Sequence, residues 1–252
     1  MREHMTRDPT IPETGQRPVS DRARGSREAQ TSASADIAAF VAKARAMTPG
    51  KAGTGRLIFA LDATMSRQPT WDMACRLQAD MFSEAGTIGG LSVRLVYYRG
   101  LNECRATQWI TDTAHLARLM GKIDCRGGQT QLGRVLSDAR REAVASGVRA
   151  IVFVGDAMEE NVDALCVTAG ELGLLKVPCF MFQEGNDPAA EAAFREIARL
   201  TGGAWCRFDT GSAAQLRELL RAAAAYATGG RDALMRLAKG TSGAAALLGQ
   251  MK

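Results

Sequence analysis

The sequence predicts an α/β fold: a Rossmann-like, doubly wound, mostly parallel six-stranded sheet with one antiparallel edge strand and helices on both faces. Between residues 55 and 228, short apolar runs alternate with amphipathic helical segments, which is typical of parallel sheets covered by helices. The runs are almost continuously apolar, as in strands buried on both faces. One pair of runs is joined by a connection too short for a crossover helix, which predicts the antiparallel edge.

Five apolar runs and a sixth, more polar one at 104–110 form the predicted strands. These are residues 56–61, 91–98, 104–110, 150–154, 177–182 and 204–208. Residues 99–103 join the second run to the third and include a glycine. A connection of that length suits a hairpin better than a helical crossover. We therefore expect the third strand to lie antiparallel at one edge of the sheet.

Five segments between the strands carry apolar residues at helical spacing. In the first of them, Met73, Leu77 and Met81 form one stripe, as in a helix that packs on a sheet. The predicted helices are residues 71–85, 131–145, 162–172, 189–200 and 213–227. Right-handed crossovers place the carboxyl ends of parallel strands on one edge. Ligands of open α/β sheets bind at that edge.

The ends of the chain differ in composition from this central domain at 55–228. Residues 1–35 hold hardly any large apolar residue and are expected to form a disordered arm, because they cannot bury enough surface to offset chain entropy. Residues 36–54 predict a short helix and a glycine-containing linker. Residues 229–252 predict a loosely docked C-terminal helical tail, with a helix near 232–239.

Composition excludes several functional classes. The net charge is +5 and the basic residues are scattered, whereas nucleic-acid binding needs a clustered basic face. No apolar stretch is long enough for a signal peptide or a membrane-spanning helix, so we expect a cytoplasmic protein that binds no membrane. The six cysteines form no CxxC pair, which predicts buried free thiols rather than a zinc site or a disulfide framework.

Three segments carry oxygen-bearing side chains at the predicted ligand-binding edge. The first runs from Asp62 to Ser66 after the first strand, the second is the loop 127–130 before a helix, and the third is Gly155-Asp156 after the fourth strand. Together they offer two carboxylates and three hydroxyls without any soft ligand. Such a set suits Mg²⁺ first, with Mn²⁺ and Ca²⁺ as alternatives.

These residues resemble the metal-ion-dependent adhesion site (MIDAS) of the von Willebrand factor A (VWA) family. That pattern is Asp-x-Ser-x-Ser after strand one, a Thr in a glycine-containing loop, and an Asp after strand four. The matching residues, in order, are Asp62, Thr64, Ser66, Thr130 and Asp156. The resemblance spans residues 55–228 and implies that the hydroxyls touch the metal, while the two aspartates act mainly through water or hydrogen bonds. Thr64 stands where Ser is usual, and Met65 and Ala157 replace common glycines, but no oxygen is lost.

The resemblance implies a metal-dependent protein-protein interaction module rather than an enzyme. The cation would coordinate an Asp or Glu carboxylate offered by a partner protein. Intracellular relatives serve as adaptors for multi-protein machines, including ATPase and chaperone assemblies, so a cytoplasmic adaptor is the expected role. Glu159 and Glu160, close to Asp156 in sequence, are expected to form a solvated helix N-terminus that the helix dipole favours.

Two other functions are compatible with the sequence. A haloacid-dehalogenase-like phosphatase or phosphotransferase would use Asp62 as its nucleophile. The general acid/base that such enzymes carry two positions later is Thr64 here, and no lysine lies between Lys122 and Lys176 to pair with phosphate. A carboxylate nucleophile needs such a proton donor. The third possibility is a metal-free scaffold that binds through its helical faces.

Overall fold

The computed structural model describes residues 55–86, 90–209 and 212–251. The chain divides into two units, residues 1–43 and 44–252, and the first lies outside the described residues. The predicted arm at 1–35 and the predicted helix and linker at 36–54 also lie outside them. The domain boundaries drawn from the sequence therefore stay predictions.

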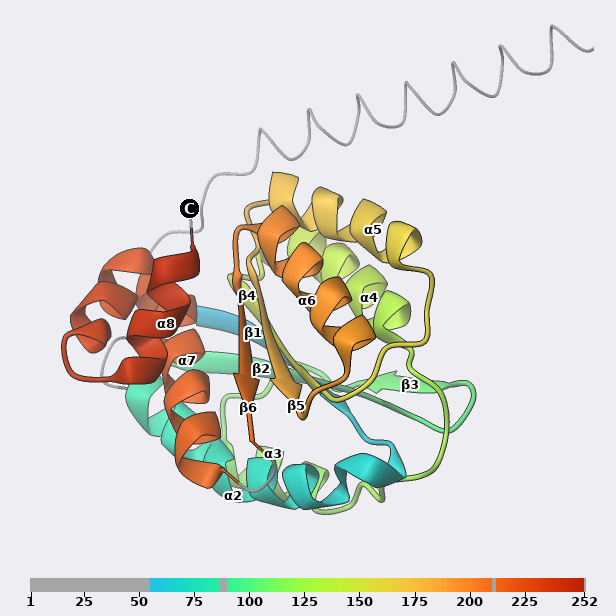
Figure 1. Ribbon diagram of the computed structural model, residues 1–252. Helices are drawn as coiled ribbons and strands as arrows, with labels where there is room; N and C mark the ends of the chain where they lie inside the picture. The colour runs from blue at the N-terminus through green and yellow to red at the C-terminus, as the bar shows by residue number, and fades with distance from the viewer. Residues whose placement is uncertain (1–54, 87–89, 210–211, 252) are drawn as a thin grey trace, which may run out of the picture. The chain divides into compact units, whose positions relative to one another are not determined.

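Six strands form one sheet in the order β3-β2-β1-β4-β5-β6 (Figure 1). Their bounds are β1 Gly55–Asp62, β2 Leu91–Arg99, β3 Glu103–Ala106, β4 Ala150–Gly155, β5 Cys179–Glu184 and β6 Ala204–Phe208. Every neighbouring pair is parallel except β2 with β3, which is antiparallel. The predicted fold class is confirmed, including the antiparallel strand at the edge.

The edge strand is shorter than the sequence predicts. β3 ends at Ala106, and Ile110 makes only an isolated bridge to Val93. At the end of the ladder, the Thr107 hydroxyl accepts the backbone N–H of Leu95 at 3.1 Å. A side chain thus takes the place of a backbone acceptor, which is one way in which Thr residues interrupt regular pairing.

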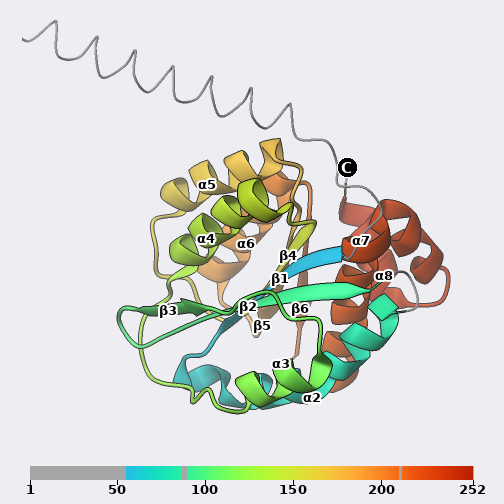
Figure 2. The ribbon, with the colours of Figure 1, turned by 180° about the vertical axis from the view of Figure 1, so that it is seen from behind.

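Helices cover both faces of the sheet. Their bounds are η1 Met65–Arg67, α2 Gln68–Gly86, α3 Thr113–Met120, α4 Leu132–Ser146, α5 Val162–Leu174, α6 Pro188–Thr201, α7 Ala213–Ala238 and α8 Ser242–Gln250. Helices α4, α5 and α6 lie on one face, and α2, α3, α7 and α8 lie on the other (Figures 1 and 2). Because both faces are covered, every β1 residue except Arg56 is buried, as its apolar run predicts.

Alternate residues of each central strand pack into two separate apolar cores, one on each face of the sheet. Leu57, Phe59 and Leu61 of β1 belong to the large apolar cluster with α2 and α7. On the opposite face, Phe153 stacks on Tyr98 with ring centroids 6.3 Å apart and meets Phe194 edge-on at 5.3 Å. Aromatic pairs at these separations add to the stability that area burial alone supplies.

The C-terminal segment is an integral part of the domain. Helix α7 continues to Ala238, with one break at Gly230, whose φ of 64° suits only glycine well. Helix α8 follows and inserts Leu247, which is fully buried, into the core. The Gln250 side chain also bonds both backbone groups of Trp205 in β6, at 2.9 and 2.8 Å. The prediction of a loosely docked tail is wrong, because a glycine-rich composition concealed this buried stripe.

All six cysteines are free thiols, as predicted, although only Cys125 and Cys179 are buried and the other four are partly exposed. Burial raises the pKa of Cys179 to about 12, so this thiol stays protonated. No helix in the described ranges combines the length and the apolar character that crossing a membrane requires.

Candidate metal-binding site

The strand order brings three carboxylates to one edge of the sheet. β1 pairs in parallel with β4, and β4 pairs in parallel with β5. Asp62 ends β1, Asp156 directly follows β4, and Glu184 ends β5. Parallel strands present their carboxyl ends on the same side, so these three side chains lie in a row across neighbouring strands.

Asp62 is almost fully buried and uses both of its carboxylate oxygens. Its Oδ1 accepts the backbone N–H of Thr64 at 2.8 Å, and its Oδ2 accepts the Tyr98 hydroxyl at 3.1 Å. Burial raises the pKa of Asp62, the hydrogen bonds from Thr64 oppose that rise, and the charge of Asp156 adds to it. Burial also raises the pKa of Tyr98 well above its usual value, so its hydroxyl remains a donor. Asp62 is therefore fixed in one orientation.

Two hydroxyls lie side by side just beyond Asp62. The Oγ1 of Thr64 and the Oγ of Ser66 are 3.2 Å apart. The short helix η1 creates this spacing, because the backbone N–H of Arg67 bonds the carbonyl of Thr64 at 3.0 Å. Adjacent oxygens around an octahedral Mg²⁺ are about 3.0 Å apart, given metal–oxygen distances of about 2.1 Å. The pair is thus already close to the spacing that two ligands of one small cation need.

The loop that carries Thr130 is tied to the ends of β1 and β4. The Thr130 hydroxyl accepts the backbone N–H of Glu159 at 3.1 Å, and the Thr130 N–H donates to the Glu159 carboxylate at 3.2 Å. Upstream, the N–H of Arg126 bonds the carbonyl of Ala63 at 3.0 Å. Within the described residues, no hydrogen bond joins Thr130 directly to the other predicted ligands. The Thr130 loop is therefore bonded to Ala63 and Glu159, which are neighbours of the predicted ligands in sequence, and not to the ligands themselves.

Glu159 and Glu160 serve a different helix from the one predicted. The Glu160 carboxylate accepts the N–H groups of Leu132 and Gly133 at the start of α4, the second at 2.9 Å. Helix α5, which follows Glu160 in sequence, is capped instead by Asn161. Carboxylates satisfy the unpaired N–H groups of a helix N-terminus and complement its dipole. These two residues therefore anchor the Thr130 loop. Glu159 is exposed, as predicted, but the assignment of the two residues to the N-terminus of the following helix is wrong.

A buried arginine lies next to the predicted ligands. Arg67 is 1% exposed, forms an ion pair with Glu184, and places its Nε 4.0 Å from Oδ1 of Asp156. Glu184 also accepts the hydroxyl of Thr70. The sequence interpretation missed both Arg67 and Glu184. Glu184 could have been found by the signal that identified Asp156, since each ends a buried apolar run.

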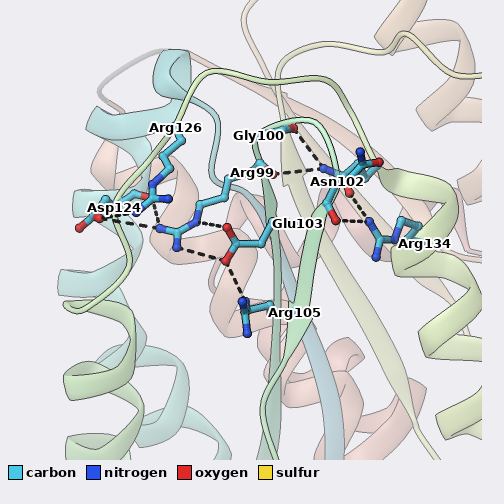
Figure 3. A network of polar contacts seen from close by, with 9 residues as sticks. Arg99, Gly100, Asn102, Glu103, Arg105, Asp124, Arg126 and Arg134 are labelled. Atoms are coloured by element: carbon cyan, nitrogen blue, oxygen red, sulfur yellow. Dashed lines mark hydrogen bonds and ion pairs between the residues drawn. The ribbon is translucent and has the colours of Figure 1, made fainter.

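The hairpin between β2 and β3 packs against the Thr130 loop. The carbonyl of Gly100 accepts the N–H of Gln129 and the side chain of Gln131, both at 3.2 Å. From α4, Arg134 reaches the carbonyl of Asn102 at 2.6 Å (Figure 3). The two loops approach so closely at Gly128 that a Cβ there would lie 2.0 Å from the Gly100 oxygen. The hairpin thus helps to position Thr130.

We expect Gly128→Ala to displace this loop, because a methyl group would overlap the backbone of Gly100. Overpacking of this kind costs about 1–3 kcal/mol, which chemical denaturation would measure. The matched control is Gly127→Ala, where an added Cβ meets no atom within 4 Å and the change should stay within about 0.5 kcal/mol. Equal stabilities of the two variants would contradict the close packing of the loops.

The donor set fits a hard cation held mainly by neutral oxygens. In the ranges that the structure describes, no three His, Cys, Asp or Glu side chains gather where they could hold a metal ion. A site here must therefore use the hydroxyls of Thr64 and Ser66 together with water, as Mg²⁺ sites with few protein ligands do. Asp156 keeps one buried oxygen without a hydrogen-bond partner among the described residues. That oxygen is Oδ1, which faces the Nε of the buried Arg67 at 4.0 Å, so a cation or its bound water would have to share it with this guanidinium.

No protein-family model and no curated protein sequence matches the chain. Solved structures do match. A von Willebrand factor type A protein from Catenulispora acidiphila is 20% identical with a TM-score of 0.55, covering 70% of this chain and 43% of that one. Mussel byssus proximal thread matrix protein 1, with a zinc-occupied MIDAS motif, is 16% identical with a TM-score of 0.52, covering 70% and 46%.

The VWA domain of SpRpn10 is 11% identical with a TM-score of 0.50, and the match covers 63% of this chain and 90% of that domain. The chain thus spans less than half the length of the bacterial and mussel proteins, but most of an isolated VWA domain. The shared arrangement of strands and helices, at such low identity, shows the fold alone. This chain has the von Willebrand factor A fold.

Proposed function

We propose that this chain is a metal-dependent protein-protein interaction module. A divalent cation at the carboxyl edge of the sheet would be held by Asp62, Thr64, Ser66, Thr130 and Asp156, and would offer an open coordination position to an Asp or Glu carboxylate of a partner. The observation that carries the proposal is the 3.2 Å separation of the Thr64 and Ser66 hydroxyls beside a fixed, buried aspartate. The module would act as an adaptor within a multi-protein complex.

The chemistry of the site supports this type of recognition. Neutral hydroxyl ligands do not cancel the charge of the cation, so the ion stays attractive to an incoming carboxylate. Ser66 is exposed whereas Thr64 and Asp62 are buried, which leaves the site open toward solvent on the Ser66 side. The zinc-occupied MIDAS motif in the mussel protein supports a divalent cation in general. We propose Mg²⁺ here, because zinc prefers nitrogen and sulfur ligands.

Titration calorimetry with MgCl₂ and MnCl₂ tests the proposal. We expect the wild type to bind and Asp62→Ala, which removes a whole carboxylate, to lose binding. Thr130→Ala and Ser66→Ala should bind more weakly, because each removes one hydroxyl oxygen of the set. Ser137→Ala is the matched control, since Ser137 is an exposed serine on α4 whose hydroxyl bonds the Gly133 carbonyl. Binding heats that are the same in Asp62→Ala as in the wild type would refute the metal assignment.

The phosphatase alternative fits the geometry less well. Both oxygens of Asp62 already accept hydrogen bonds, from the Thr64 N–H and from Tyr98. A carboxylate nucleophile needs a free oxygen directed at the phosphorus atom and a nearby proton donor. Turnover of a generic phosphate ester with Mg²⁺, lost in Asp62→Asn, would favour the enzyme over the binding module.

A further inference from the structure

A basic groove runs between β3 and helix α4. It has a volume of about 480 Å³, and its lining includes Arg94, Arg134 and Arg141 beside the carboxylate of Asp138. Asp138 is shared by Arg94 and Arg141, and Arg94 also pairs with Glu142 at 3.6 Å. Among the described residues, Arg134 is the groove arginine that no carboxylate offsets. The groove therefore carries an excess of positive charge, which favours an acidic occupant.

Arg134, an exposed cation of the groove, has no carboxylate partner among the described residues. Arg134 donates to the carbonyl of Asn102 at 2.6 Å and to the side-chain oxygen of Gln131 at 2.7 Å. Both acceptors are neutral, so neither of them offsets the positive charge of the guanidinium. Arg105 shares Glu103 with Arg99 (Figure 3), and that one carboxylate faces two cations.

β3 also presents an unpaired edge. It is the last strand of the sheet, and no described strand pairs with its outer side. The N–H of Thr107 bonds Leu95 on β2 at 2.9 Å. Since inward and outward groups alternate along an antiparallel strand, the backbone groups of Cys104 and Ala106 point away from β2. These groups are available to a further strand.

Arginines flank this edge on both faces of the sheet. Arg105 pairs with Tyr97, which meets Trp71 of α2, so Arg105 lies on the α2 face. Arg134 and Arg141 extend from α4 on the other face, and Figure 3 shows Arg105 and Arg134 on opposite sides of β3. A strand added to β3 would direct its side chains alternately to these two faces. Acidic side chains on both faces would then meet arginine.

We propose that an extended acidic segment of a partner protein binds here, adding a strand to β3 and pairing its carboxylates with Arg105, Arg134 and Arg141. A short, positively charged edge repels a second copy of itself, which disfavours pairing between two copies of this chain. Main-chain pairing supplies affinity, and the flanking charges select the sequence of the segment. The groove requires no cation, so this proposal is independent of the metal site.

Fluorescence polarisation in the presence of a chelator tests the proposal. The probe is a short fluorescein-labelled peptide of alternating glutamate pairs and valine pairs, which places acids on both faces of a strand. We expect the wild type to bind it, and the combined variant Arg105→Gln, Arg134→Gln and Arg141→Gln to bind about tenfold more weakly or worse. The control variant Arg118→Gln, Arg199→Gln and Arg236→Gln removes the same charge from exposed arginines elsewhere and should bind as the wild type does.

A separate variant tests whether the peptide adds a strand to β3. Ala106→Pro removes an outward N–H without altering charge, and proline is tolerated on edge strands, so binding should weaken about tenfold while the circular dichroism spectrum is unchanged. Three results would overturn the proposal: equal binding by the two arginine variants, unchanged binding by Ala106→Pro, or displacement of the peptide by oligothymidylate more readily than by unlabelled peptide. Because all arms contain chelator, none of these results bears on the cation assignment.

Discussion

Arg67→Met should be among the most destabilising single substitutions in this domain. The guanidinium is 1% exposed and contacts Glu184, which is itself 5% exposed. Methionine fills a similar volume but leaves Glu184 as a buried charge without a cation. Breaking a buried ion pair from one side costs about 3–5 kcal/mol. Chemical denaturation of the wild type and the variant would measure this difference.

A second substitution separates lost charge from lost packing. Adding Glu184→Gln to Arg67→Met removes the uncompensated carboxylate, while the Thr70 hydroxyl can still bond the amide. We expect the double variant to regain most of the lost stability, since removing both partners of a buried pair is often nearly neutral. A double variant that is no more stable than Arg67→Met would show that packing, rather than charge, explains the effect.

The sequence predicted the sheet well because its strands are buried on both faces. Near-continuous apolar runs of that kind are hard to confuse with other elements, and β1, β4 and β6 lie within a residue of their predicted bounds. The antiparallel edge followed from the length of one connection, whereas the strand order was not predicted. β5 begins and ends two residues later than predicted, and β3 differs most. It lies at an edge, where side-chain bonds such as that of Thr107 decide where the ladder ends, and no apolar pattern records such bonds.

The candidate site was predictable only where its residues directly follow strands. Asp62 and Asp156 share that signal, and the structure places both at one edge. The roles of the neighbouring charges depend on contacts between segments that are distant in sequence. Glu160 binds the start of α4, and Arg67 lies between the ends of β4 and β5. Spacing along the chain contains no information about such contacts, so the sequence alone does not predict the buried ion pair.

Leu247→Ala should destabilise the whole domain rather than a local appendage. Leu247 is fully buried and belongs to the same apolar cluster as Leu57 and Phe59 of the central strand. Removing a buried leucine side chain costs about 2–5 kcal/mol, from lost burial and from the cavity that remains. Because α8 and the sheet share one core, the loss should appear in a single cooperative unfolding transition.

Leu101→Ala is the matched control, because it makes the same substitution at an exposed position. Leu101 is 68% exposed on the hairpin loop, so its truncation should change the free energy of unfolding by no more than about 0.5 kcal/mol. If α8 unfolded in a separate, earlier transition, or if the two leucine variants were equally stable, the C-terminal helix would be an independent tail. The shared core instead predicts one unfolding transition and a large loss of stability in Leu247→Ala alone, because α8 and the sheet depend on the same buried contacts.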